Sequence, residues 1–110
     1  MNVDDKEVQK FNNISYSWWD PEGPFKPLHM LNPIRINFIK NRVDLNGKSV
    51  IDVGCGGGLL CENLISNKNN VKGIDMSQDA IEIAKTHQVI NNLNIDYQQI
   101  SLENLIAESN

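Results

Sequence analysis

The sequence predicts an α/β fold with a parallel sheet, and three observations lead to this prediction. Short apolar runs at 49–53, 71–75 and 95–100 have the length and composition of β-strands. The segments that follow the first two runs, at 59–66 and 77–90, have the residue spacing of helices. The links between these segments are short. Strands that alternate with helices in this way form right-handed βαβ units, whose strands are parallel.

Length and composition limit the class of protein. The chain has 110 residues, of which 40% are hydrophobic, enough for one small domain with a packed core. A net charge of −4 argues against a nucleic-acid-binding surface. No apolar run reaches the roughly eighteen residues of a membrane span. The polar, acidic start MNVDDKEVQK is neither a secretory signal nor an Arg-rich transit peptide, so we predict a cytoplasmic protein.

The segment before the first strand is predicted to be largely helical. Asp4 and Glu7 have the spacing of a capping box, and the helix should run to about Trp19. The stretch DPEGPFKP at 20–27 holds three prolines and a glycine and is predicted to be a loop.

A second helix is predicted from Leu28 to about Val43. Pro33 is tolerated only near the first turn of a helix, so Asn32 is an alternative start. The apolar stripe expected on this helix consists of Leu31, Ile34, Phe38 and Ile39.

Three further local signals complete the expected elements. Asn46-Gly47 marks a turn, Ser77 is a suitable N-cap, and 102–107 begins another helix. Cys55 and Cys61 match neither a zinc pattern nor a CxxC motif. We therefore expect two reduced, partly buried thiols and no metal site.

A glycine-rich loop follows the first strand. In SVIDVGCGGGLL, the residues Gly54, Gly56 and Gly58 have GxGxG spacing between a strand and a helix. Glycines at this place allow positive φ and expose backbone N–H groups, which suits a nucleotide-like ligand. The dinucleotide fingerprint GxGxxG needs a small residue where Leu59 stands, which disfavours NAD. The alternative is a tight turn without a ligand.

The second strand ends in an acid. Asp75 closes VKGID, twenty-one residues after Gly54. In a βαβ unit this places a carboxylate at the carboxyl edge of the sheet, facing the glycine loop. A carboxylate there can accept hydrogen bonds from both hydroxyls of a ribose. The alternative is a strand-end cap or an exposed acid.

These motifs together resemble a known family. VIDVGCGGG followed by GIDMS resembles motifs I and II of the class I S-adenosylmethionine-dependent methyltransferases. WWDPEGPFKPLHMLNPIR resembles the ubiquinone biosynthesis O-methyltransferases, and the resemblance extends from about Val8 to Leu105. It implies a Rossmann-like fold with strand order 3-2-1. Residues 1–47 would form an N-terminal helical cap or acceptor lid, and 48–110 the first half of the cofactor domain.

The resemblance also implies which residues contact S-adenosyl-L-methionine. The three loop glycines would lie against the methionine part. Asp52 would steady the loop or reach the methionine amino group through water. Arg35 would reach the methionine carboxylate, which suits its forked donors. Asp75 would hold the ribose. The remaining two contacts, both to adenine, would be Met76 and Ser101, the latter standing where many relatives carry an Asp-Ala pair.

The implied reaction transfers a methyl group to a phenolic oxygen of a polyprenylated phenol or catechol. Such a transfer depends mainly on positioning. His29, beside the implied acceptor side, is a candidate to touch the substrate, whereas His87 lies on an apolar stripe and is expected to pack. Of Trp18 and Trp19, one should pack on the core, and the other is a candidate to cover the acceptor ring.

The length of the chain adds a further expectation. Class I methyltransferases have a seven-stranded sheet, and only three strands are predicted here. We therefore expect a fragment that binds the cofactor weakly and does not methylate alone. An unpaired edge at 49–53 favours a dimer, and a polyprenyl tail implies peripheral membrane contact. The alternatives are a methyltransferase with another small acceptor, a non-catalytic cofactor-binding module and, last, an NAD-linked oxidoreductase.

Overall fold

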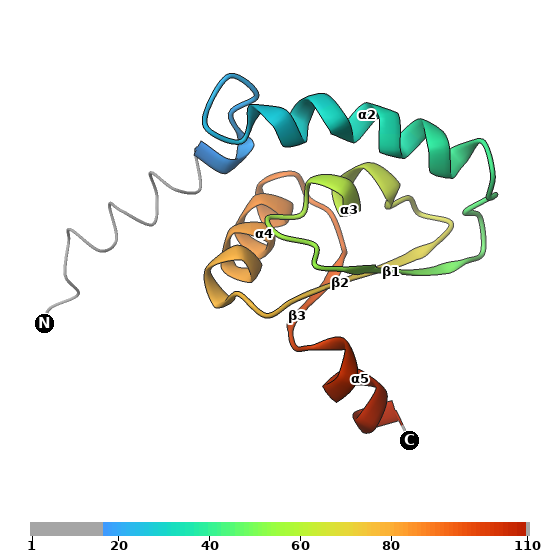
Figure 1. The fold of residues 1–110 in the computed structure, drawn as a ribbon. Coiled ribbons are helices and arrows are strands. Elements are labelled where there is room, and N and C mark those ends of the chain that lie inside the picture. Colours follow the sequence, from blue (N-terminus) through green and yellow to red (C-terminus); the bar gives the residue numbers. More distant parts are fainter. Residues whose placement is uncertain (1–16, 110) are drawn as a thin grey trace, which may run out of the picture.

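A three-stranded parallel sheet lies at the centre of the fold (Figure 1). This computed structural model describes residues 17–109. The strands are β1 (Ser49–Val53), β2 (Asn70–Asp75) and β3 (Asp96–Gln99), and β2 lies between the other two. Both strand pairs are parallel, as predicted, and the order β1-β2-β3 is the expected 3-2-1 read from the other edge.

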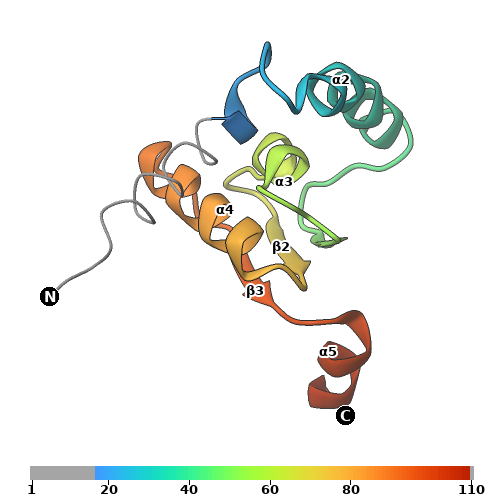
Figure 2. The same cartoon turned by 60° about the vertical axis from the view of Figure 1, so that its left-hand side comes forward.

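Helices follow each strand. They are α3 (Leu59–Leu64), α4 (Gln78–Ile90) and α5 (Leu102–Ser109). The predicted cap of α4 is confirmed, because the Ser77 hydroxyl accepts a hydrogen bond from the Ala80 N–H at 3.2 Å. Figure 2 shows α3 and α4 on one side of the sheet, with α5 pointing away from them. The buried core lies between these two helices and the strands, and it contains Leu64, Val71, Ile74, Ile81, Ile83, Ala84, Ile95 and Tyr97.

Helix α2 (Lys26–Lys40) differs from its prediction at the start. It begins two residues before Leu28, and Pro33 lies inside it, so the alternative start at Asn32 is wrong. Pro33 removes one helical hydrogen bond, but the turn around it is anchored. The buried Asn32 side chain donates a hydrogen bond to the Leu59 carbonyl at the start of α3, at 3.2 Å. The hydrogen bond between Asn32 and α3 therefore overrides the preference of proline for the first turn of a helix.

The buried face of α2 also differs. Of the predicted stripe, only Ile39 packs against the core. Leu31, Ile34 and Phe38 are exposed, with Ile34 at 65% of its full accessible area. The helix turns Asn32 inward instead. The predicted stripe is therefore wrong, because a polar anchor on α3 sets the rotation of the helix.

The first predicted helix falls mostly outside the described residues. Its capping box of Asp4 and Glu7 lies there, while residues 17–19 are helical. This short segment packs through two aromatic contacts. Trp19 stacks on His87 of α4, with ring centroids 3.5 Å apart and planes at 3°, and the Trp18 and Phe25 centroids lie 4.4 Å apart. The N-terminal segment is thereby fixed against α4.

Strand β1 forms one edge of the sheet within the described part of the chain. Its side chains Ile51 and Val53 are 44% and 53% exposed. The expectation of an apolar edge at this strand is confirmed. Dimerisation through this edge stays a prediction.

Candidate functional site

The loop between β1 and α3 has a backbone that only glycine adopts easily. Gly54, Gly56 and Gly58 have φ values of +77°, +57° and +93°. These values lie in the left-handed region, which side-chain-bearing residues occupy at a cost. The spacing of the three glycines is therefore required by the path of the chain from strand to helix.

The Asp75 carboxylate faces this loop from the end of β2. One oxygen, Oδ2, accepts a hydrogen bond from the Gly56 N–H at 2.9 Å, and Oδ1 accepts one from the Ser77 N–H at 2.8 Å. A carboxylate has about four lone-pair positions. Each Asp75 oxygen can therefore accept one more donor, such as a hydroxyl group.

The expectation of free loop amides is wrong for four residues, one of which is Gly58, whose N–H donates to the Cys55 carbonyl at 3.2 Å. The N–H groups of Gly54 and Cys55 both donate to the Ile74 carbonyl, at 2.8 and 2.9 Å, and that of Gly56 donates to Asp75. These hydrogen bonds to Ile74 and Asp75 hold the loop against the end of β2. Its polarity toward a ligand comes from the carboxylate more than from bare amides.

A pocket of about 450 Å³ opens beside this carboxylate. Four of the residues that the sequence singled out line it, namely Gly54, Asp75, Met76 and Ser101, together with apolar side chains of β1, β2 and the segment into α5. The Ser101 hydroxyl also caps α5 by accepting the Asn104 N–H at 3.1 Å. The lining is mainly apolar and includes two carboxylates, those of Asp75 and Glu103, a polarity that suits a nucleoside.

Asp52 and Arg35 lie near the loop but do not line this pocket. Burial raises the pKa of Asp52, whereas a hydrogen bond from the Cys61 thiol, at 3.6 Å, and the Arg35 guanidinium act in the opposite direction. Arg35 donates from Nη2 to the Asn32 side chain at 3.1 Å, and its buried Nε has no partner among the described residues. Their role as cofactor contacts stays a prediction.

The two cysteines are free and buried, Cys61 completely. Hydrogen bonding with the Cys55 thiol, followed by burial, raises the pKa of Cys61. Both thiols therefore belong to the core beneath the glycine loop. Within the described residues, no group of three or more acidic, histidine or cysteine side chains could hold a metal ion.

The Asp52→Asn substitution should change how stability depends on pH. Because the folded chain holds the Asp52 proton more tightly than the unfolded chain, the free energy of unfolding decreases as pH rises from 3.8 through the raised pKa. Asparagine cannot ionise, so the variant should lose less stability than the wild type as the pH rises from about 4 toward neutrality. Urea unfolding across this range measures the difference. The exposed Asp79→Asn variant is the control, and parallel pH profiles for wild type and Asp52→Asn would contradict the prediction.

The two histidines have structural contacts. The Nε2–H of His29 donates to the Trp18 carbonyl at 2.9 Å, and His29 does not line the pocket beside Asp75. His87 packs as expected, with its Nδ1 2.7 Å from the Glu62 carboxylate and its ring on Trp19. A substrate contact for His29 stays a prediction, and the described geometry does not bring it to the candidate site.

Two aromatic residues lie at the glycine loop, where the sequence did not place them; Trp18 was only a candidate to pack on the core or to cover the acceptor ring. Trp18 lies against Gly56 and Gly57, and Tyr97 lies behind Gly58. The alternation in β3 indicates that Tyr97 points inward, but neither contact can be read from local spacing. In the sequence, the adjacent pair Trp18-Trp19 is the one feature that draws attention to the contact between Trp18 and the loop.

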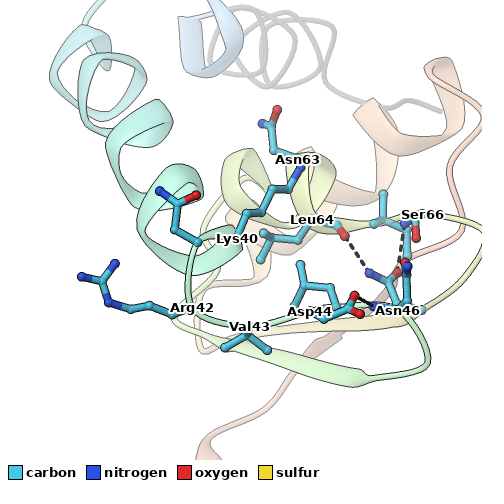
Figure 3. Close-up of a pocket in the computed structure, with 12 residues that line it drawn as sticks. Lys40, Arg42, Val43, Asp44, Asn46, Asn63, Leu64 and Ser66 are labelled. Atoms are coloured by element: carbon cyan, nitrogen blue, oxygen red, sulfur yellow. Dashed lines mark hydrogen bonds between the residues drawn. The ribbon is translucent and has the colours of Figure 1, made fainter.

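A larger pocket, of about 510 Å³, lies elsewhere (Figure 3). It is formed where α2, the turn before β1 and the end of α3 meet, and Lys40, Asp44, Asn46 and Ser66 are among its lining residues. The hydrogen bonds within it are local turn contacts, such as that from the Asn46 N–H to Asp44 at 3.0 Å. None of the residues predicted for the cofactor lines it, so pocket size does not identify the site.

Fold and site together define a class. A parallel sheet with a glycine loop after β1 and an acid at the end of β2 is the nucleotide-binding half of a Rossmann-like domain. The methyltransferase-domain family matches residues 50–110, and the chain belongs to this family. The predicted class I methyltransferase family, whose cofactor is S-adenosylmethionine, is thereby confirmed.

Similar proteins agree with this assignment. The ubiquinone biosynthesis O-methyltransferases of Haemophilus ducreyi and Nitrosococcus oceani are 50% and 48% identical to the chain. The matches cover 94% and 96% of this chain and 44% of each relative. The chain thus spans about half the length of these curated relatives. The crystal structure of magnesium protoporphyrin IX methyltransferase from Synechocystis, with bound S-adenosylmethionine, shares the fold, with a TM-score of 0.67 at 20% identity over 92% of this chain and 56% of that chain.

Proposed function

We propose that this chain binds S-adenosylmethionine in the pocket beside Asp75 and supplies the cofactor-binding part of an O-methyltransferase. The observation that carries the proposal is the Asp75 carboxylate, which faces the glycine loop and keeps a free acceptor position on each oxygen. The residues present suit this cofactor. A Cβ on Gly54 would meet nothing within 4 Å, so open space lies against the loop where a ligand can approach.

Each part of the pocket then has a proposed role. Asp75 accepts hydrogen bonds from the ribose hydroxyls. Met76, which is 74% exposed, and Ser101 border the adenine. Gly54, Gly56 and Gly58 provide the backbone over which the methionine part lies. Asp52 supports the loop from β1, and Arg35 reaches the methionine carboxylate.

The proposed acceptor is a polyprenylated phenol or catechol, because the relatives are named for ubiquinone biosynthesis. The cofactor supplies a methyl group on a sulfonium sulfur. The chain's residues bind and orient the two reactants, since transfer requires the acceptor oxygen in line with the bond that breaks. The division into a cap at 1–47 and a cofactor domain at 48–110 belongs to the same proposal, with the cap on the acceptor side.

Two partner assignments accompany this proposal. A polyprenyl tail would bring the acceptor to a membrane surface, which implies peripheral contact. None of the helices in residues 17–109 has the length and apolar character to cross a membrane. Pairing of two copies along the exposed edge of β1 is the proposed route to a dimer.

Calorimetry with S-adenosylhomocysteine tests the proposal. We expect saturable binding at one site per chain, and no comparable heat with NADH, because the loop departs from the dinucleotide pattern at Leu59. The second readout is transfer of a labelled methyl group to a catechol-type acceptor, which this chain alone should not perform, because it spans about half the length of its relatives. Absence of S-adenosylhomocysteine binding to a folded chain would contradict the proposal.

A further inference from the structure

A pocket of about 430 Å³, which we call the α2–α3 pocket, lies between these two helices. Its lining comes from the segment before α2, from α2 and from α3. It shares no lining residue with the pocket beside Asp75. A ligand beside Asp75 therefore does not fill this cavity, which can hold a molecule of its own.

Rings form much of the wall of the α2–α3 pocket. Pro21 and Pro33 contribute two of them, and Ile36 adds an aliphatic side chain. Trp19 also lines the pocket. Because one face of its indole is stacked on His87, with centroids 3.5 Å apart, its other face and its edges remain for a ligand. A flat apolar ring is the kind of molecule that such a wall contacts well.

His29 gives this pocket a hydrogen-bond acceptor. Its Nε2 lies 2.9 Å from the Trp18 carbonyl oxygen, which can only accept, so Nε2 carries the hydrogen. In the neutral imidazole this leaves the lone pair on Nδ1. Among the described residues Nδ1 has no partner, and it is not one of the buried unpartnered atoms. It is therefore open to a donor in the pocket that His29 lines.

The charge of the lining limits the class of ligand further. None of the residues that line the α2–α3 pocket is an aspartate, glutamate, lysine or arginine. A charged ligand would give up its hydration there without meeting an opposite charge, which is costly. The pocket thus suits a neutral molecule with an aromatic ring and one donor. A phenol, whose O–H has a pKa near 10, fits this description.

We propose that the α2–α3 pocket binds a neutral hydroxyaromatic ring, whose O–H donates a hydrogen bond to His29 Nδ1. The ring packs against Trp19 and the two prolines. The inference goes beyond the proposed function, because it requires neither the cofactor nor methyl transfer. It agrees with the proposed acceptor class, and most of the lining belongs to the proposed cap at 1–47.

The first test compares phenol with anisole, its methyl ether, which has the same ring and no O–H. In an NMR titration the wild type should bind phenol about twofold to tenfold more tightly than anisole. His29→Gln keeps an N–H for the Trp18 carbonyl but lacks the acceptor at Nδ1, so it should lose this preference. Met30→Gln is the matched control, because Met30 is 65% exposed and lies outside the lining. It should keep the preference. Absence of phenol binding to the folded wild type, or an unchanged preference in His29→Gln, would overturn the inference.

A second measurement needs the wild type alone. The chain has two histidines, so the nitrogen spectrum of its imidazoles contains two rings. His29 should show the tautomer with hydrogen on Nε2. Phenol should shift its Nδ1 signal more than anisole does and leave His87 nearly unchanged. Equal shifts with both ligands, or hydrogen on Nδ1 in the free protein, would contradict the inference.

Competition identifies the pocket and separates the two proposals. Saturating S-adenosylhomocysteine should leave the affinity for phenol within about twofold, because the two pockets share no lining residue. Displacement of phenol would place it beside Asp75 and overturn the inference. If a folded chain binds phenol at His29 but does not bind S-adenosylhomocysteine, the proposed function fails and the inference stands.

Discussion

Replacing Asp75 with asparagine is expected to weaken S-adenosylhomocysteine binding about a hundredfold, because hydrogen bonds to a charged acceptor contribute about 1.5–3 kcal/mol each. Asparagine keeps one acceptor oxygen and turns an amide NH2 toward a donor. The charge is lost, and so is the acceptor for one ribose hydroxyl. Calorimetry measures the change in affinity, and an unchanged dissociation constant would remove Asp75 from the ribose.

The Asp75 carboxylate also accepts two hydrogen bonds within the protein. A second experiment must therefore show that the loss of affinity comes from lost contacts with the ligand. The substitution leaves either the Gly56 or the Ser77 N–H without its acceptor. A ligand with 2′-deoxyribose separates the two effects. The wild type should bind it more weakly than the ribose form, whereas the Asp75→Asn variant should discriminate less between them. The exposed Asp79→Asn variant should behave as the wild type, and equal discrimination by Asp75→Asn and wild type would indicate that only loop support was lost.

The parallel sheet and the position of Asp75 could be predicted because they depend on local signals. Apolar runs of strand length, an N-cap at Ser77 and short links lead to βαβ units with little choice of topology. The carboxyl ends of adjacent parallel strands meet at one edge, so an acid at the end of β2 faces the loop after β1. The pairing of Asp75 with Gly56 follows from that geometry.

Other parts of the site depend on contacts between distant residues. The rotation of α2 is set by the hydrogen bond between Asn32 and the Leu59 carbonyl, twenty-seven residues apart. The apolar stripe predicted for this helix is therefore not its buried face. The loop amides bond to the end of β2, which the glycine spacing does not reveal. The placement of Trp18 on the loop results from packing against α2 and α4. Each of these requires the assembled fold.

The Gly58→Ala substitution is expected to lower the free energy of unfolding by about 2–5 kcal/mol, a large part of the stability of a small domain. Two costs add. The φ of +93° lies where a side chain is strained, and the new methyl group would collide with the Tyr97 hydroxyl and lie 3.3 Å from the Ala84 Cβ. Denaturant unfolding measures the loss.

Two further variants separate strain from collision. Gly47 also has a positive φ, +74°, but a Cβ there meets nothing within 4 Å, so Gly47→Ala should cost only the backbone term of about 1–2 kcal/mol. The Tyr97 hydroxyl is buried without a partner among the described residues, so Tyr97→Phe alone should be close to neutral. Adding it to Gly58→Ala should restore about 1–2 kcal/mol, because it removes the atom that the methyl group meets. If Gly58→Ala costs no more than Gly47→Ala and gains nothing from Tyr97→Phe, then Tyr97 does not pack against the loop as described, and the close fit between β3 and the glycine loop is wrong.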